Sequence, residues 1–491
     1  RSGVQGLEQD TDMVSLRMTW DVNENYTISA VTGYVDFDHW ELDDYSLGAG
    51  VFGGLHNNIY ESFSQELQIA SNFDGPFNFQ AGVYWQEIEQ EFDAYQYAFN
   101  LALMPNIFGP VYALVGGDPN AVIIGPDPIT GNAYDYNKHH FLDSDVFSAF
   151  LAVYWDITDK TELTMGVRYT DEEKEGHIEI PYIHAAAILF GFTAPPLIEG
   201  LEFDDSNTSP EVALTHDWND DISFYVSYKE GFKSGGVDNS ALPTAALGQA
   251  ALTGDFGFLI YESEESEGWE VGMKGNFLDG AMRLNATVFS YDYSDLQVQL
   301  FDSQIIQFFT SNAETVTTEG FEFDMLWQTD IEGLSLRTAW AWTEAEVSES
   351  FINATGQDLK GQKLTGNAEV AGFVGFTYDM GINDNWRMSF SSDARYTDDY
   401  KWTATNPGYD QDSFWLWDAA ISLYSEDERH QISVIGRNLG DEIYSVGGGN
   451  IPGRCPIVTT PECEAVISDL QDQVAYVPLG RQVFVRYKFT L

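Results

Sequence analysis

Apolar and polar side chains alternate at every second position in one long segment after another along this chain. The segment 386–396 shows the pattern clearly. One face holds Trp386, Met388, Phe390, Ala394 and Tyr396, and the other holds Arg387, Ser389, Ser391, Asp393 and Arg395. A period of two is typical of a strand with one apolar and one hydrated face. Because long helical periodicity is nearly absent, the sequence predicts an all-β fold.

The alternating segments are about 10 to 17 residues long, whereas strands of soluble sandwiches average roughly 5 or 6. The connections between them are alternately very short and very long. This alternation is typical of outer-membrane barrels, which have tight periplasmic turns and long external loops. The short turns are rich in Asp, Asn and Gly and lie at 21–25, 72–76, 156–160, 217–221, 277–280, 330–333, 380–384 and 425–428. The long loops are 41–60, 93–142, 178–202, 233–263, 300–308, 348–366, 400–412 and 438–481.

Several tryptophans lie within a few residues of a short turn, where a membrane barrel carries an aromatic girdle. They are Trp20, Trp155, Trp218, Trp327 and Trp386. No run approaches the roughly 18 apolar residues of a transmembrane helix, which excludes a helical inner-membrane protein. We therefore predict a transmembrane antiparallel β-barrel with about 17 strands in this chain. Bacterial barrels have an even number of strands, so we expect residues 1–491 to be the C-terminal part of a larger barrel.

The chain is strongly acidic, with 78 Asp and Glu against 22 Lys and Arg and a formal net charge of -56. This charge argues against nucleic acid as a partner. The 44% of hydrophobic residues argues against disorder, so the acids are interpreted as a hydrated exterior. No nucleophile, base and orienting group are recognisable together. We therefore expect no catalytic residues and no cofactor.

One pair of neighbouring histidines, His139 and His140, falls in the expected loop 93–142. The pair has two interpretations, a metal site or two hydrated loop side chains. Because histidine pairs in loops are usually only hydrated, we predict no metal site.

Five segments, in this order, resemble TonB-dependent outer-membrane receptors of the iron-complex type. They are SFSQELQIAS (62–71), YKEGFKSGG (228–236), WEVGMKGNFLDGAMRLNATVFSYDYSDLQVQ (269–299), NAETVTTEGFEFD (312–324) and RNLGDEIY (437–444). The last strand, VFVRYKFTL (483–491), is similar to the C-terminal signal of outer-membrane barrels, although Leu491 replaces the usual Phe.

The resemblance implies a barrel of 22 strands that is occluded by an N-terminal plug, with plug, coupling box and first strands ahead of this chain. It also implies a place in the bacterial outer membrane, among lipid and lipopolysaccharide, and energy from the TonB-ExbB-ExbD complex. The expected ligand is a small-molecule nutrient, with a siderophore-type iron chelate favoured. A passive porin-like channel and a secreted all-β protein that binds polysaccharide are the alternatives.

Ligand specificity is expected in the external loops, where aromatic side chains supply contact area. The candidate ligand-binding residues are Trp402, Tyr409, Tyr97, Tyr112 and Tyr134. Because the loops carry many acids and few bases, we also expect a neutral or cationic ligand, or an anionic one bridged by divalent cations. Cys455 and Cys463 lie close together in loop 438–481 and are expected to form a disulfide.

Overall fold

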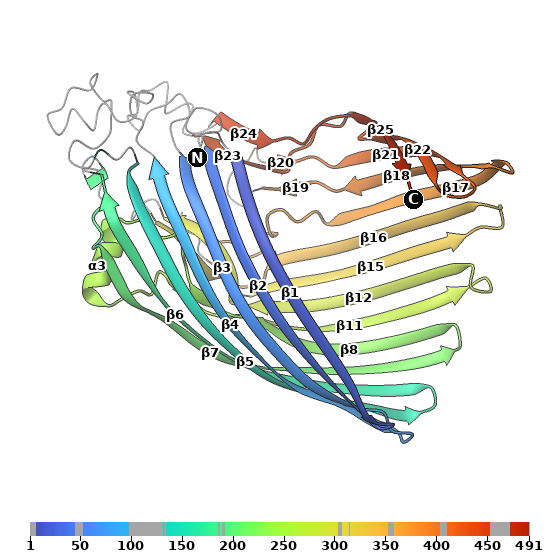
Figure 1. The fold of residues 1–491 in the computed structure, drawn as a ribbon, viewed down its shortest axis with the longest axis horizontal. Coiled ribbons are helices and arrows are strands. Elements are labelled where there is room, and N and C mark those ends of the chain that lie inside the picture. Colours follow the sequence, from blue (N-terminus) through green and yellow to red (C-terminus); the bar gives the residue numbers. More distant parts are fainter. Residues whose placement is uncertain are drawn as a thin grey trace.

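The computed structural model describes residues 6–44, 53–97, 131, 134–184, 187–188, 192–302, 307–313, 315–351, 358–402, 410–451 and 472–490. A single antiparallel sheet of 17 strands dominates these residues, and each strand pairs with the next strand of the sheet along the chain (Figure 1). The prediction of an all-β fold with about 17 strands is confirmed.

The strands of the main sheet are β1 (Gly6–Asn23), β2 (Tyr26–Asp44), β3 (Gly53–Ser71), β4 (Phe77–Tyr97), β5 (Tyr136–Thr158), β6 (Thr161–Ile183), β7 (Leu197–Asn219), β8 (Ile222–Lys233), β11 (Glu264–Phe277), β12 (Met282–Ser294), β15 (Val316–Gln328), β16 (Leu334–Val347), β17 (Val370–Asn383), β18 (Trp386–Thr397), β21 (Phe414–Ser425), β22 (His430–Arg437) and β25 (Gln482–Phe489). Short elements lie in the connections: β9 (Gly236–Val237), α3 (Ala245–Thr253), β10 (Ile260–Tyr261), β13 (Leu296–Asp302), β14 (Gln307–Ala313), β19 (Tyr400–Lys401), β20 (Asp410–Gln411), β23 (Gly447–Ile451) and β24 (Asp472–Tyr476).

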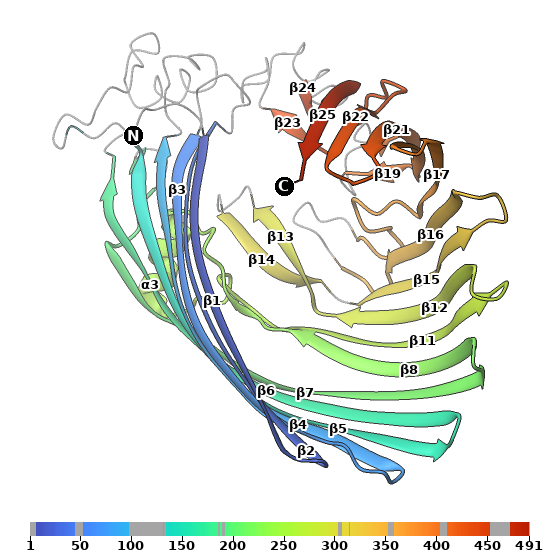
Figure 2. The same cartoon turned by 45° about the vertical axis from the view of Figure 1, so that its right-hand side comes forward.

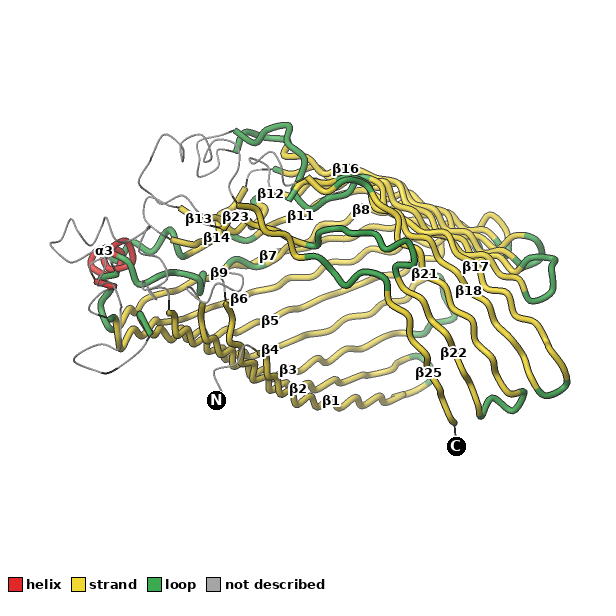
Figure 3. Tube along the Cα trace, turned by 90° about the horizontal axis from the view of Figure 1, so that it is seen from above, coloured by secondary structure: helices red, strands yellow, loops and turns green. Residues whose placement is uncertain are grey.

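The sheet curves into a wall that is open along one side, between its edge strands β1 and β25 (Figures 2 and 3). Each edge strand pairs with only one described neighbour, β1 with β2 and β25 with β22. All eight short turns lie at one end of the strands, where the sequence placed them. That end is the periplasmic rim, and the long connections gather at the opposite, external rim.

The first three external loops are shorter than predicted, because the strands on either side of them are longer than predicted. Strands β5, β6 and β7 each contain 23 residues. His139 and His140 therefore lie in β5 and not in a loop, which corrects their predicted place. The connection predicted at 300–308 is longer than predicted, because β12 ends at Ser294 and the connection contains the β13–β14 hairpin.

The two faces of the sheet differ in polarity. Directly paired positions share a face, so the exposed apolar residues form continuous rows on the outside, such as Leu67 opposite Val83 and Leu151 opposite Val167. Further members of this face are Trp85, Phe147, Val271, Val288, Val374, Ile421 and Val434. The opposite face is polar and includes the buried residues Ser148, Thr170, Ser227, Ser422 and Ser433. An apolar outer face and a polar lumen are typical of a membrane barrel.

The girdle tryptophans lie within a few residues of a strand end at the periplasmic rim, and Trp20 and Trp218 are among the most exposed aromatic residues. This exposure fits a ring at a membrane interface rather than one in a soluble core. Among the described residues, no helix combines the length and apolar character that a membrane span requires.

Glycines opposite aromatic residues shape the wall. The directly paired sets are Gly82 with Phe150, Gly268 with Tyr291, Gly272 with Tyr225, Gly320 with Phe289, and Gly372 with Trp340. In each set the ring lies over the glycine of the neighbouring strand, so an added Cβ atom meets its nearest ring atom at 2.2 to 2.5 Å. The aromatic ring of the neighbouring strand thus fills the space that a side chain at the glycine would occupy.

We expect Gly268→Val to destabilise the barrel by about 2 kcal/mol, because the new side chain must displace the Tyr291 ring and press on the Ser290 carbonyl. Gly280→Ala at a periplasmic turn is a matched glycine control without neighbours within 4 Å, although its positive φ strains the turn. Urea unfolding in detergent measures both variants. A Gly268→Val midpoint equal to that of the parent protein would contradict this account of the glycine–aromatic pairs.

Candidate functional site

The described part of the external mouth is built around the connection 234–263. This connection holds β9, α3 and β10, and it packs against the external ends of β6 and β7. Its core is formed by Ile178, Ile198, Leu201, Leu247 and Leu259, each at most 2% exposed. Gly254 ends α3 in a left-handed conformation, with its N–H on the carbonyl of Ala250. The connection is therefore a folded cap and not a loose loop.

A buried lysine fastens this cap to the wall. Lys138 of β5 donates hydrogen bonds to the carbonyl oxygens of Asn239 and Ala241, the second at 2.8 Å. The ammonium group is fully desolvated, and burial lowers the pKa of Lys138 to about 8, although Asp238 opposes the shift. Two carbonyl acceptors and a nearby carboxylate supply the partners that a buried cation requires.

A second connection is tied to the first. Thr310 of β14 donates to the Asp238 carboxylate at 2.6 Å. Asn312 donates to the carbonyl of Glu262 at 2.9 Å, and Gln297 of β13 donates to that of Ser234 at 3.0 Å. The β13–β14 hairpin and the 234–263 cap thus form one hydrogen-bonded unit above the wall. A rigid unit of this kind suits a binding surface, since it needs little ordering when a ligand arrives.

An apolar groove of about 620 Å³ opens between α3 and the β6–β7 connection. Ile180, Tyr182, Phe192, Ala245 and Leu252 are among its lining residues. Its volume lies within the range of small-molecule sites, and Tyr182, Thr193 and Gln249 add polar groups to its mainly apolar lining. The groove lies at the external rim, where ligand contacts were predicted.

One of the predicted aromatic residues contacts a residue that lines this groove. The ring of Tyr134 lies edge-on to that of the groove residue Tyr182 at 5.2 Å and to that of Tyr95 at 5.5 Å. Trp402 lies elsewhere on the rim, edge-on to Tyr400 at 5.1 Å, so the two predicted residues do not form one site.

Other predicted positions remain without a structural description of their side chains. Tyr97 ends β4, and nothing is described of its ring. Tyr112, Tyr409, Cys455 and Cys463 lie outside the described residues, so their roles stay predictions.

The two neighbouring histidines point to opposite faces, since successive residues of a strand alternate. His139 lies opposite Asp93 on the outer face. His140 is buried on the inner face beside Lys138, and its Nε2 atom has no hydrogen-bond partner within the described parts of the chain. Burial lowers the pKa of His140 to about 3, and the charge of Lys138 adds to the shift. The pair cannot share one ion.

Sequence reasoning missed the cap and its lysine anchor. The anchor joins residues more than 100 positions apart, and such a contact leaves no local pattern. The run of Ala and Leu at 245–253 was the available signal for α3, because both residues are strong helix formers.

The apolar outer face, polar lumen, tight periplasmic turns and folded external cap define an outer-membrane β-barrel with a structured mouth. Residues 1–439 match the family model described as TonB-dependent receptor-like, beta-barrel. The chain therefore belongs to this receptor family, and its place is the bacterial outer membrane. Family and fold are those of transport receptors and not of enzymes. No curated protein matches the chain.

Solved structures show the same fold at low identity. The ferric yersiniabactin uptake receptor FyuA from Yersinia pestis is 15% identical, with a TM-score of 0.71 over 99% of this chain and 62% of that chain. The siderophore receptor PiuA from Acinetobacter baumannii is 15% identical, with a TM-score of 0.69 over 99% and 65%. The ferric-catecholate import receptor Fiu from E. coli K12 is 14% identical, with a TM-score of 0.63 over 99% and 64%. This chain thus spans less than two thirds of each of these structures.

Proposed function

We propose that the working receptor imports a scarce nutrient, with a siderophore-type iron chelate as the favoured ligand, and that the TonB-ExbB-ExbD complex supplies the energy. Family membership supports the transport role, and the similar structures include a yersiniabactin, a siderophore and a catecholate receptor. The observation that carries the proposal within this chain is the apolar groove on a rigid external cap. Ligand binding there requires no covalent chemistry.

We also propose that the sheet is completed to 22 strands in the working receptor and that a plug domain fills the lumen. The two edge strands support this, because each pairs with only one strand among the described residues, and an unpaired strand edge inside a membrane leaves its backbone groups without hydrogen bonds. We expect the protein from native membranes to have an intact mass well above the 55.0 kDa of this chain. A mass near 55.0 kDa, measured by mass spectrometry, contradicts the proposal.

The transport proposal is tested by uptake of radioactive iron as ferric chelates. Iron-starved cells are expected to lose uptake of one chelate when the gene is deleted and when TonB is inactivated. Uptake that survives TonB inactivation would indicate a passive channel instead. Uptake of every chelate unchanged in the deletion strain contradicts iron import.

The groove is tested separately by two matched substitutions of exposed apolar residues. Leu252→Asp places a charge on the groove wall, and Ile443→Asp places one on an external connection outside it. The first is expected to weaken ligand binding about 10-fold or more, since it sets a charge against an apolar contact. The second is expected to leave binding unchanged. Equal affinities of the two variants would remove the groove from the ligand site.

A further inference from the structure

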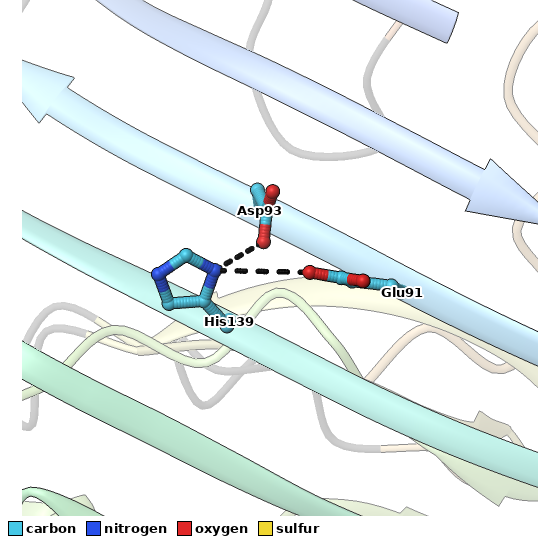
Figure 4. Close-up of side chains that lie close together, drawn as sticks. All are labelled: Glu91, Asp93 and His139. Carbon is cyan, nitrogen blue, oxygen red and sulfur yellow. Dashed lines mark hydrogen bonds and ion pairs between the residues drawn. The ribbon is translucent and has the colours of Figure 1, made fainter. Parts of the chain in front are cut away.

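Three potential metal ligands meet on the outer face of the wall, away from the lumen and the groove. Glu91 and Asp93 belong to β4, and His139 belongs to β5 (Figure 4). Asp93 lies directly opposite His139 in the register, and Glu91 lies on the same face two residues away. Two neighbouring strands thus hold all three side chains in place.

Their donor atoms converge. One oxygen from each carboxylate and one ring nitrogen of His139 all lie within 4.8 Å of one another. His139 Nδ1 is hydrogen-bonded to Asp93 Oδ1 and lies 4.0 Å from Glu91 Oε1. Donors at about 2.1 Å from a tetrahedral ion lie roughly 3.4 Å apart, so small side-chain rotations complete the geometry.

The three side chains are sheltered enough to hold an ion. Their exposed fractions are 18% for His139, 14% for Asp93 and 32% for Glu91. Glu91 and Asp93 place two carboxylates on one face of β4 in a partly buried place, so their charges repel each other. A cation between them would relieve that repulsion.

A neighbouring amide supplies a separate observation. Asn137 is 8% exposed, and its Nδ2 atom lies 3.2 Å from His139 Nε2. Its Oδ1 atom is buried and has no hydrogen-bond partner among the described residues. An imidazole that binds a metal through Nδ1 carries its proton on Nε2 and needs an acceptor there. A half-turn of the amide exchanges its two atoms, so that the unpaired oxygen becomes this acceptor.

We propose that Glu91, Asp93 and His139 bind one first-row divalent cation of the Zn²⁺ type on the outer face of the barrel, with Asn137 as the acceptor that orients the imidazole. The imidazole donor favours such a cation over Ca²⁺ or Mg²⁺, which prefer oxygen ligands alone. The ion joins β4 to β5 near the external rim. Glu179 of β6 lies directly opposite His139 in the register on the other side of β5.

Zn²⁺ titration of the purified receptor by calorimetry is the first test, followed by Co²⁺ as a spectroscopic probe. We expect one tight Zn²⁺ per protein and a Co²⁺ absorption band that reports a nitrogen ligand. His139→Ala and Asp93→Asn are expected to abolish the tight binding. Asn137→Ala is expected to weaken it by about 10-fold or more while the three ligands remain in place.

Two variants control for the high acidity of the surface. Glu89→Gln removes a carboxylate of the same strand and face, and His216→Ala removes a histidine near the periplasmic rim. Both are expected to keep the tight site. A titration without a tight equivalent, or one that His139→Ala leaves unchanged, overturns the proposal and reduces the cluster to an ion pair. Heat-modifiable gel mobility of each variant reports whether the barrel has folded. A variant that folds but does not bind Zn²⁺ has therefore lost the site and not the fold.

Discussion

Lowering the pH from 7 to 5 is expected to loosen the 234–263 cap while the membrane-spanning part of the sheet stays folded. The group responsible is His140, which is buried on β5 where the cap is anchored, near Lys138, Asp238 and His177. Its pKa is lowered from 6.5 to about 3, chiefly by burial and further by the charge of Lys138. With the cap in place the imidazole remains neutral at pH 5, whereas a freed His140 takes up a proton.

The direction of the effect follows from proton binding. Between pH 6.5 and about 3 the open form binds more protons than the closed form, so closure weakens as the pH falls. The slope is about 1.4 kcal/mol per pH unit, which gives roughly 2 kcal/mol at pH 5. The stability contributed by a neutral His140 is fully present above pH 6.5.

Hydrogen exchange measured by mass spectrometry, corrected for intrinsic rates, should show faster exchange of cap peptides at pH 5 than at pH 7. His140→Gln cannot titrate in this range and is expected to lose most of the difference. His216→Gln, near the periplasmic rim, serves as the histidine control and is expected to keep it. A cap that opens equally with pH in the parent and in His140→Gln would assign the effect to other groups.

The turns could be predicted because their chemistry is local. The side chains of Asn23, Asn219 and Asn383 each accept a hydrogen bond from the backbone N–H two residues later, at 2.8 to 2.9 Å. Three periplasmic turns thus repeat one asparagine-based structure. Leu278 and Asp279 have positive φ, as a tight hairpin connection requires. Such turns depend only on a few adjacent residues, so the sequence alone places them.

The external ends of the strands could not be predicted from local sequence. There the outward positions carry acids, so the apolar alternation that marks a membrane strand disappears although the backbone continues as a strand. His139 and His140 were placed in a loop for this reason. The cap was missed for another reason, since Lys138 and its acceptors are far apart in the sequence. Polarity marks the membrane boundary and not the end of the strand.

A final prediction concerns these acids, which follow the register across seven strands. Asp36 lies opposite Asp12 and Glu61, and the row continues through directly paired positions. Its members are Asp12, Asp36, Glu61, Glu89, Asp143, Glu175 and Glu202. All seven are exposed on the outer face. Like charges at directly opposite positions destabilise a sheet, so the row weakens the external ends of β1 to β7 unless cations screen it.

The triple variant Asp36→Asn, Glu89→Gln and Glu175→Gln removes one charge from every neighbouring pair of the row. It is expected to unfold roughly 5 °C higher than the parent protein at low salt in the presence of a chelator. Addition of Mg²⁺ should raise the unfolding midpoint of the parent protein and remove most of its difference from the triple variant. Bound cations and the substitutions both reduce the repulsion between the acids of the row. A control triple, Asp217→Asn, Asp220→Asn and Asp221→Asn at the periplasmic rim, keeps the net charge equal. If both triple variants shift the unfolding midpoint equally, net charge determines the stability, and the direct pairing of acids across strands has no effect of its own. If only the outer row responds, divalent cations stabilise the external ends of these strands, and chelation of those ions should destabilise the protein.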